Sequence, residues 1–177
     1  SDFYIDYPVL GVRKEKTGKE IIDTFIPGMV LTIEKLKNNP DKKIFKRLFA
    51  PTFSHTINKE GRSCKSCHNN PQALGYGKGE LTFSNSGKWI FKPYYSNHPE
   101  DNLPKDAWID FLKTRNEKST TRINTRLFTV EEQKRILTVG TCLICHKSDS
   151  VVIIDALHNF AKTLTMRSPK CILPIWN

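Results

Sequence analysis

Apolar residues recur at the spacing of a helix in four segments of the chain. In residues 41–49 they fall on one face and Pro51 follows, which predicts a short helix that ends before the proline. Pro104 suits a first helical turn, and the apolar residues of 107–112 share one face behind it. We therefore expect a second helix that begins at Pro104.

Two further helices are predicted in the last third of the chain. Thr129 and Glu132 form a capping box, in which each side chain satisfies a backbone N–H of the other residue. The helix that they open has an apolar face and runs towards Cys142. Residues 155–164 repeat the helical spacing, so we expect a helix there with His158 at the rim of its apolar stripe.

Alternating aromatic residues indicate one β-hairpin. Residues 81–83 and 89–91 are its strands, and the Asn-Ser-Gly sequence at 85–87 is its turn. The first 40 residues mix glycine and proline with short β-prone stretches, which suggests irregular or short-stranded structure. Together these patterns predict a mainly α fold with extensive loops and a small β-hairpin.

Four of the five cysteines fall in two identical Cys-x-x-Cys-His motifs, residues 64–68 and 142–146. This is the attachment signature of a c-type haem, in which two thiols add to the two vinyl groups of the porphyrin. The histidine that follows binds the iron from the proximal side. The sequence therefore predicts two haem c groups, with thioether bonds and proximal ligands supplied by Cys64, Cys67 and His68 and by Cys142, Cys145 and His146.

Two other kinds of site use paired cysteines. In a structural zinc site the two pairs are separated by about 15–20 residues, far fewer than separate these two motifs. A thioredoxin-like dithiol is a single pair at the start of a helix in a βαβ unit. Neither site needs a histidine directly after each second cysteine, so the haem interpretation is favoured.

Three histidines remain for the distal sides of the two irons. His55 lies in a loop rich in turn residues nine positions before Cys64, and His158 lies at the rim of a predicted helix. His98 lies in a polar turn, where a solvated histidine is common, and is a weaker candidate. Cys171 is left over as a free thiol, an intermolecular partner or a thiolate ligand.

The chain is basic, with 28 Lys and Arg residues against 18 Asp and Glu and a formal charge of +10. The lysines are spread along the sequence without a basic block interleaved with aromatic residues, which argues against nucleic-acid binding. We expect the charge to steer acidic redox partner proteins and to be offset in part by haem propionates. The best apolar run, residues 151–154, is far shorter than the roughly 18 residues of a membrane span.

The motifs and their flanking residues resemble multihaem c-type cytochromes. The likeness covers roughly residues 50–150 and rests on 54–56, 62–68, 70–75 and 132–146. It implies a distal histidine upstream of a motif, which favours His55, and a compact haem-packed domain. We expect a single dihaem domain over residues 1–177, with 1–50 as an irregular N-terminal lobe packed on it. By family pattern it is not a tandem pair of class I cytochromes, because the chain after Cys142 is too short.

Electron transfer is the favoured function. Two haems that are closed by protein ligands on both sides leave no place for a substrate, which suits a soluble redox shuttle or a relay subunit. The alternative is a dihaem oxidoreductase in which one open or labile haem acts on a small inorganic substrate. Thioether attachment takes place outside the cytoplasm, so we expect export to the periplasm or an equivalent compartment. A homo-oligomer or a subunit of a redox complex is compatible with either function.

Overall fold

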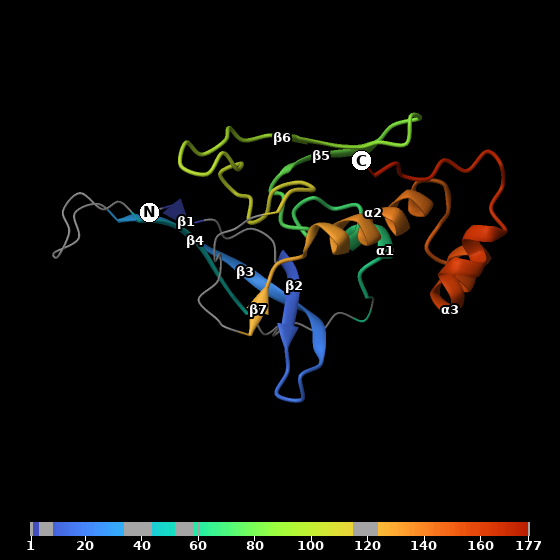
Figure 1. Ribbon diagram of the computed structural model, residues 1–177, viewed down its shortest axis with the longest axis horizontal. Helices are drawn as coiled ribbons and strands as arrows, with labels where there is room; N and C mark the ends of the chain where they lie inside the picture. The colour runs from blue at the N-terminus through green and yellow to red at the C-terminus, as the bar shows by residue number, and fades with distance from the viewer. Residues whose placement is uncertain are drawn as a thin grey trace.

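The computed structural model describes residues 2–3, 9–33, 44–51, 59, 61–114 and 124–176. In these segments the chain forms seven strands in two antiparallel sheets and three helices, labelled β1–β7 and α1–α3 (Figure 1). The prediction of a mainly α fold is therefore wrong, since the protein is a mixed α/β fold. None of the helices in the described segments is long and apolar enough to cross a membrane.

The larger sheet is built around one long strand, β3 (Glu20–Ile33). Its first half pairs with β2 (Val9–Lys14) and its second half with β1 (Asp2–Phe3), while β4 (Ile44–Pro51) lies along its other edge. The short β7 (Thr125–Arg126) pairs with β2 and brings a distant part of the chain onto the sheet.

The expectation of an irregular or short-stranded N-terminal part is wrong for the described residues 9–33 and 44–51, which form β2, the long β3 and β4. β3 is 14 residues long and passes straight through Pro27 and Gly28, which the sequence suggested as breaks. The pairing of β3 with β4 shifts register between Pro27 and Met29, so an irregularity in the ladder accommodates these residues without ending the strand.

The helix predicted over residues 41–49 is also wrong, because Ile44–Pro51 is strand β4. Its residues pair in sequence with those of β3, from Ile33 opposite Ile44 to Phe25 opposite Pro51. A neighbouring strand rich in β-branched residues offers this segment a long antiparallel ladder of backbone hydrogen bonds, and tertiary pairing overrides the local helical spacing.

Arg47 of β4 explains why residues 104–112 form turns instead of the predicted helix. The Arg47 side chain is fully buried and donates hydrogen bonds to the carbonyls of residues 103, 105 and 107, besides pairing with Asp101. These carbonyls are the acceptors that a helix would need for its own N–H groups. The N–H groups of Trp108 and Ile109 both turn to the carbonyl of Gly75 instead.

The predicted β-hairpin is confirmed. Strands β5 (Gly79–Phe83) and β6 (Trp89–Pro93) pair from Phe83 opposite Trp89 to Gly79 opposite Pro93. Gly87 in the turn has φ 77°, a left-handed conformation that glycine adopts without strain. The indole N–H of Trp89 bonds to the Leu137 carbonyl and the Thr141 hydroxyl, which attaches the hairpin to the buried face of α2.

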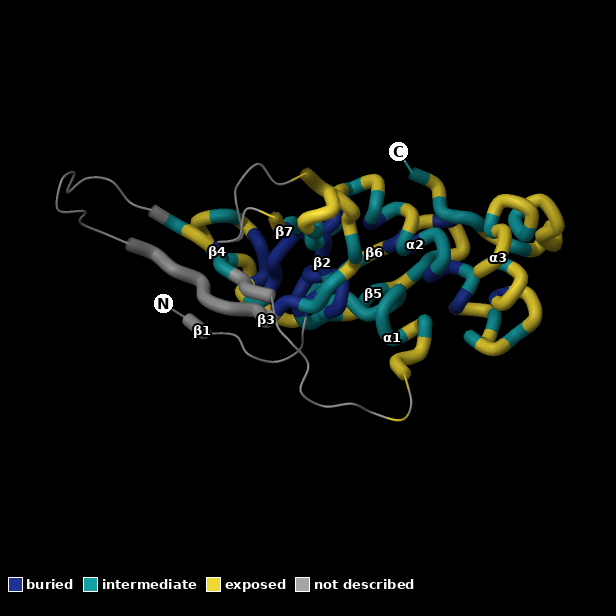
Figure 2. The backbone as a smooth tube through the Cα atoms, turned by 90° about the horizontal axis from the view of Figure 1, so that it is seen from below, coloured by how far each residue is buried: buried dark blue, intermediate teal, exposed yellow. Residues whose placement is uncertain are grey.

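Helix α2 (Val130–Cys145) begins at the predicted capping box. The Thr129 hydroxyl accepts from the Glu132 N–H, and the Glu132 carboxylate accepts from the Thr129 N–H. Leu137 of α2 is completely buried in one core with Phe25, Tyr76 and Trp108, drawn from the sheet and the loops. Figure 2 shows this buried region between β2 and α2.

Helix α3 (Val151–Thr165) confirms the last predicted helix and lies at the far end of the molecule from the N-terminal sheet (Figure 1). Ile153 is its one fully buried residue. After α3 the chain returns towards the hairpin, where the Ile175 N–H bonds to the Gly87 carbonyl. The second cysteine motif therefore lies where α2 ends and the connection to α3 begins.

Candidate functional site

The first motif forms helix α1 (Cys64–His68). The Ser63 side chain caps it by accepting from the Ser66 N–H at 3.2 Å. Cys64, Cys67 and His68 stand at positions i, i+3 and i+4, so the helix presents both thiols and the imidazole on one face. Both sulfurs are part of partly exposed residues, and an external group can reach them.

The imidazole of His68 is held by a backbone carbonyl. Its Nδ1 lies 3.0 Å from the carbonyl oxygen of Ile136 on α2. A carbonyl oxygen only accepts hydrogen bonds, so Nδ1 carries the proton of the neutral ring and Nε2 keeps its lone pair. Histidines that bind metal ions usually donate their other ring N–H in this way, which fixes the tautomer and the orientation of the ring.

The second motif lies at the C-terminal end of α2. Cys142 and Cys145 are in its last turn, and His146 follows with an extended backbone at φ −109° and ψ 138°. Burial, and then the nearby thiols of Cys171 and Cys145, raise the pKa of the Cys142 thiol. Cys171 on the C-terminal segment therefore lies in the neighbourhood of this motif.

Apolar side chains are exposed at the end of α2 and on α3. Ile144, between the two cysteines, is 47% exposed, and α3 starts five residues after His146. Val151, Ile154 and Leu157 of α3 are 72%, 44% and 76% exposed and follow one another at intervals of three residues, on one side of the helix. The stripe predicted within residues 155–164 consists of Leu157, Ala161 and Leu164, of which the first two are exposed and the third is half-buried. Exposed apolar residues that gather on one surface indicate a site of interaction.

The three candidate distal histidines differ in their surroundings. His158 is exposed on α3, directly before Asn159, whose backbone at φ −154° and ψ 85° interrupts the helix. His98 stacks on Phe45 of β4, and its Nδ1 accepts the N–H of Glu100 at 3.2 Å. This bond places the proton of the neutral His98 ring on Nε2, the opposite of His68, and disfavours iron binding through Nε2. His55 lies outside the described residues.

A cleft of about 600 Å³ lies beside α1, but not on the side of its thiols. Its lining includes Lys65, Ser66 and Asn69, which alternate on α1 with the residues of the thiol face. Their polar groups are already engaged in part: the Ser66 hydroxyl donates to the Ser63 carbonyl and the Asn69 amide to the Gly140 carbonyl. The cleft is therefore separate from the motif chemistry.

The described residues do not bring the two cysteine pairs together. Within these segments no group of three or more His, Cys, Asp or Glu side chains is placed to hold a metal ion alone, which argues against one zinc site made from both motifs. Every strand pairing in the same segments is antiparallel, so α1 does not belong to a βαβ unit of the thioredoxin kind. In the described residues the two motifs therefore remain two separate sets of two thiols and one imidazole.

Two groups that contact the first motif could not be predicted from the sequence, or only weakly: the carbonyl of Ile136 and the backbone at Gly140. The acceptor for His68 is a backbone carbonyl, which any residue at position 136 provides. Gly140, one turn later, faces Asn69 at close range. A glycine in the middle of a predicted helix is the one signal that could have indicated this close approach.

Comparison with known proteins gives no relative: no protein family, curated protein or solved structure matches the chain.

Proposed function

We propose that this chain is a c-type cytochrome that transfers electrons through two covalently attached haems. Cys64 and Cys67 attach one haem and Cys142 and Cys145 the other. His68 and His146 bind the two irons on their proximal sides. The observation that carries the proposal is the hydrogen bond between His68 Nδ1 and the Ile136 carbonyl.

A histidine that binds a metal ion needs a fixed tautomer and a fixed ring orientation, whereas a solvated histidine needs neither. The hydrogen bond of His68 provides both and therefore supports the proposal. It leaves Nε2 of His68 unprotonated and holds the ring in one orientation on the face that carries both thiols. The bond also makes the ring a stronger electron donor, which favours the ferric state of a bound iron. The Cys-x-x-Cys-His spacing alone would not have required this partner.

The second motif is supported by its apolar surroundings. The side chain of Ile144, between Cys142 and Cys145, is exposed to water, and so are those of Val151, Ile154 and Leu157 on the following helix. A large apolar group attached to these thiols would remove part of that surface from water, at about 25 cal/mol per Å². The ring of His146 makes no hydrogen bond within the described part of the chain and is free to act as a ligand.

Each haem, when attached, supplies an iron that exchanges one electron between its ferric and ferrous states. The residues of the chain bind the irons, set their potentials and limit access to them. His55 and His158 are the proposed distal ligands, and with both in place neither iron has a position for a substrate. Export to the periplasm or an equivalent compartment and docking of acidic redox partners belong to the same proposal.

The test is haem attachment and coordination in the protein produced with a c-type haem assembly system. We expect a mass higher than that of the polypeptide by two haems. Replacing Cys64 and Cys67 with Ala, or Cys142 and Cys145, should each remove one haem. Cys171→Ala is the matched control, because Cys171 lies outside both motifs, and it should keep two.

The absorption spectrum then separates electron transfer from the alternative. Two low-spin haems that do not bind carbon monoxide or cyanide support electron transfer. A high-spin component that binds these ligands supports a dihaem oxidoreductase with one open site, acting on a small inorganic substrate. A protein without covalent haem contradicts both.

A further inference from the structure

Helices α1 and α2 are joined by two hydrogen bonds one helical turn apart. His68 Nδ1 donates to the Ile136 carbonyl at 3.0 Å, and Asn69 Nδ2 donates to the Gly140 carbonyl at 3.1 Å. Both acceptors are backbone groups of α2, and both donors are neighbouring residues at the end of α1. The first motif is therefore fixed to the helix that ends in the second motif.

Gly140 permits this approach. A Cβ atom at Gly140 would meet Asn69 Oδ1 at 2.5 Å and the His68 carbonyl oxygen at 3.3 Å, so a larger residue would displace the Asn69 side chain and crowd the end of α1. Glycine is among the least favourable residues in the interior of a helix. Its presence in the middle of α2 is explained by the contact with α1, since its φ is not in the left-handed region.

We propose that this contact is a positioning device that couples the two haem sites, with Gly140 and Asn69 as its positioning residues. The inference rests on the proposed function and deepens it. The contact keeps the proton of His68 on Nδ1 and so sets the donor strength of the ligand at the first motif. The same bond connects that ligand to α2, whose last turn carries Cys142 and Cys145.

The two motifs are connected through a short stretch of α2. Six residues separate Ile136 from Cys142 along the helix, which corresponds to a rise of about 9 Å. The helix between them is hydrogen-bonded throughout and has the buried residues Leu137, Gly140 and Thr141. A charge change at one motif is therefore transmitted over a short, rigid and partly dry path to the other, where screening by salt is weak.

The experiment compares the reduction potentials of both haems in four proteins. Gly140→Ala displaces the Asn69 side chain and crowds the His68 carbonyl, and it should thereby weaken the bond from His68. A weaker donor favours the ferric state less, so we expect the potential of the haem at Cys64 and Cys67 to rise. Adding Asn69→Ala removes the closer of the two clashes and should return the potential towards that of the original protein. Gly61→Ala is the matched control, because no atom lies within 4 Å of its added Cβ.

The two redox steps are assigned with a variant that lacks the second haem, Cys142→Ala with Cys145→Ala. If the sites are coupled, loss of the second haem also shifts the potential of the first. Asn69→Ala alone removes one hydrogen bond without a steric clash and tests the contact if Gly140→Ala does not fold. It should shift the same step in the same direction by a smaller amount.

The outcomes distinguish the inference from the proposed function. A protein without covalent haem overturns both. Two attached haems whose potentials are the same in Gly140→Ala, Asn69→Ala and the original protein overturn the coupling contact and leave the cytochrome proposal standing. An equal shift in Gly61→Ala also overturns it, because the effect would then be unrelated to the α1–α2 contact.

Discussion

His68 and His98 show how one backbone partner decides what an imidazole can do. The carbonyl of Ile136 accepts from Nδ1 of His68 and leaves Nε2 free to bind, whereas the N–H of Glu100 donates to Nδ1 of His98. The His98 ring also stacks on Phe45, and this contact helps to hold His98 in the loop. Motif context distinguished the two histidines, but it could not predict which ring nitrogen carries the proton, because the partners in both cases are backbone atoms.

The first prediction concerns the distal ligands. We expect His158→Ala to convert one low-spin haem to a form that binds carbon monoxide, because His158 stands exposed on the helix that follows the second motif. His98→Ala is the control of the same size, and it should leave both haems low-spin. The absorption spectra of the ferrous proteins with and without carbon monoxide measure both. Low-spin haems in both variants would exclude His158 as a ligand.

At the scale of elements, the sequence predicted an element correctly where the residues that stabilise it are close together in the chain. The capping box of Thr129 and Glu132 and the turn at Gly87 are complete within a few residues, and both elements are confirmed. Strand β4 and the loop at 104–112 depend on partners far along the chain, β3 and Arg47. The apolar spacing of residues 41–49 fits a helix, and only the neighbouring strand decides against it.

The same division holds for the candidate site. The thiols and proximal histidines of both motifs could be predicted, since their spacing is local. The Ile136 carbonyl and the close approach at Gly140 could not, because they arise where α1 and α2 meet. The amphipathic pattern of α3 predicted a helix correctly but not its exposure, since the pattern does not say what covers the apolar face.

The second prediction concerns the junction between α2 and the sheet. Arg126 of β7 forms two hydrogen bonds with the Glu132 carboxylate, at 2.7 and 3.0 Å, and a third with Glu20 at 2.8 Å. Burial disfavours the charged form of Glu132, but the hydrogen bonds from Arg126 and Thr129 outweigh it and hold the pKa of Glu132 below its ordinary value. The ionised carboxylate thus stabilises the folded state.

Because the folded pKa of Glu132 is lowered, its stabilising effect is complete above the unfolded pKa and is lost as pH falls through the folded pKa. We expect the original protein to be more stable than Glu132→Gln at pH 7. The difference should shrink below about pH 4.5, the ordinary pKa of a glutamate, and vanish at lower pH. Urea unfolding at a series of pH values measures it. A difference that is constant with pH would mean that Glu132 acts only through its shape.

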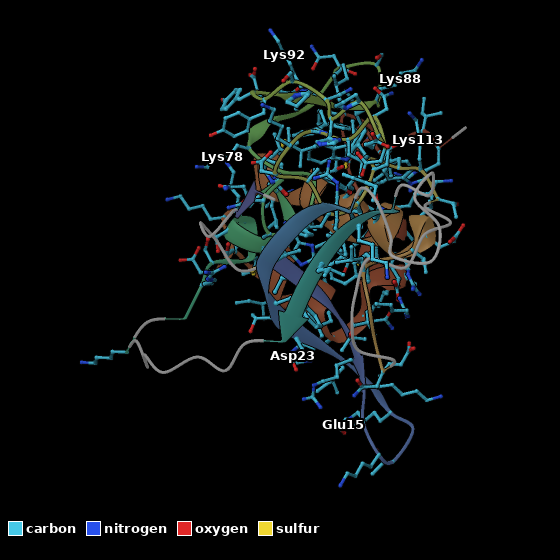
Figure 3. All side chains as sticks on the ribbon, turned by 90° about the vertical axis from the view of Figure 1, so that its left-hand side faces the viewer. Glu15, Asp23, Lys78, Lys88, Lys92 and Lys113 are labelled. Carbon is cyan, nitrogen blue, oxygen red and sulfur yellow. The ribbon has the colours of Figure 1, made fainter. Side chains whose placement is uncertain are left out.

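At the scale of the whole molecule, lysine side chains project from and around the β5–β6 hairpin. Lys78, Lys88, Lys92 and Lys113 project at one end, around the β5–β6 hairpin, and Glu15 and Asp23 lie at the other (Figure 3). The hairpin is joined to α2 by the bond from Trp89 to Thr141, the residue before Cys142. The exposed Lys88 directly precedes Trp89 in the chain, at the end of the hairpin that is bonded to α2.

The last prediction is that this charge steers redox partners. Oxidation of the reduced protein by the anion hexacyanoferrate(III) should slow as salt is added, and oxidation by the cation tris(phenanthroline)cobalt(III) should accelerate. Lys88→Glu should slow the reaction with the anion severalfold at low salt. Lys16→Glu makes the same change of charge in the exposed turn between β2 and β3, away from both motifs, and should have the smaller effect. Equal effects of the two variants would show that net charge alone acts, because steering by a local field depends on where the lysine lies.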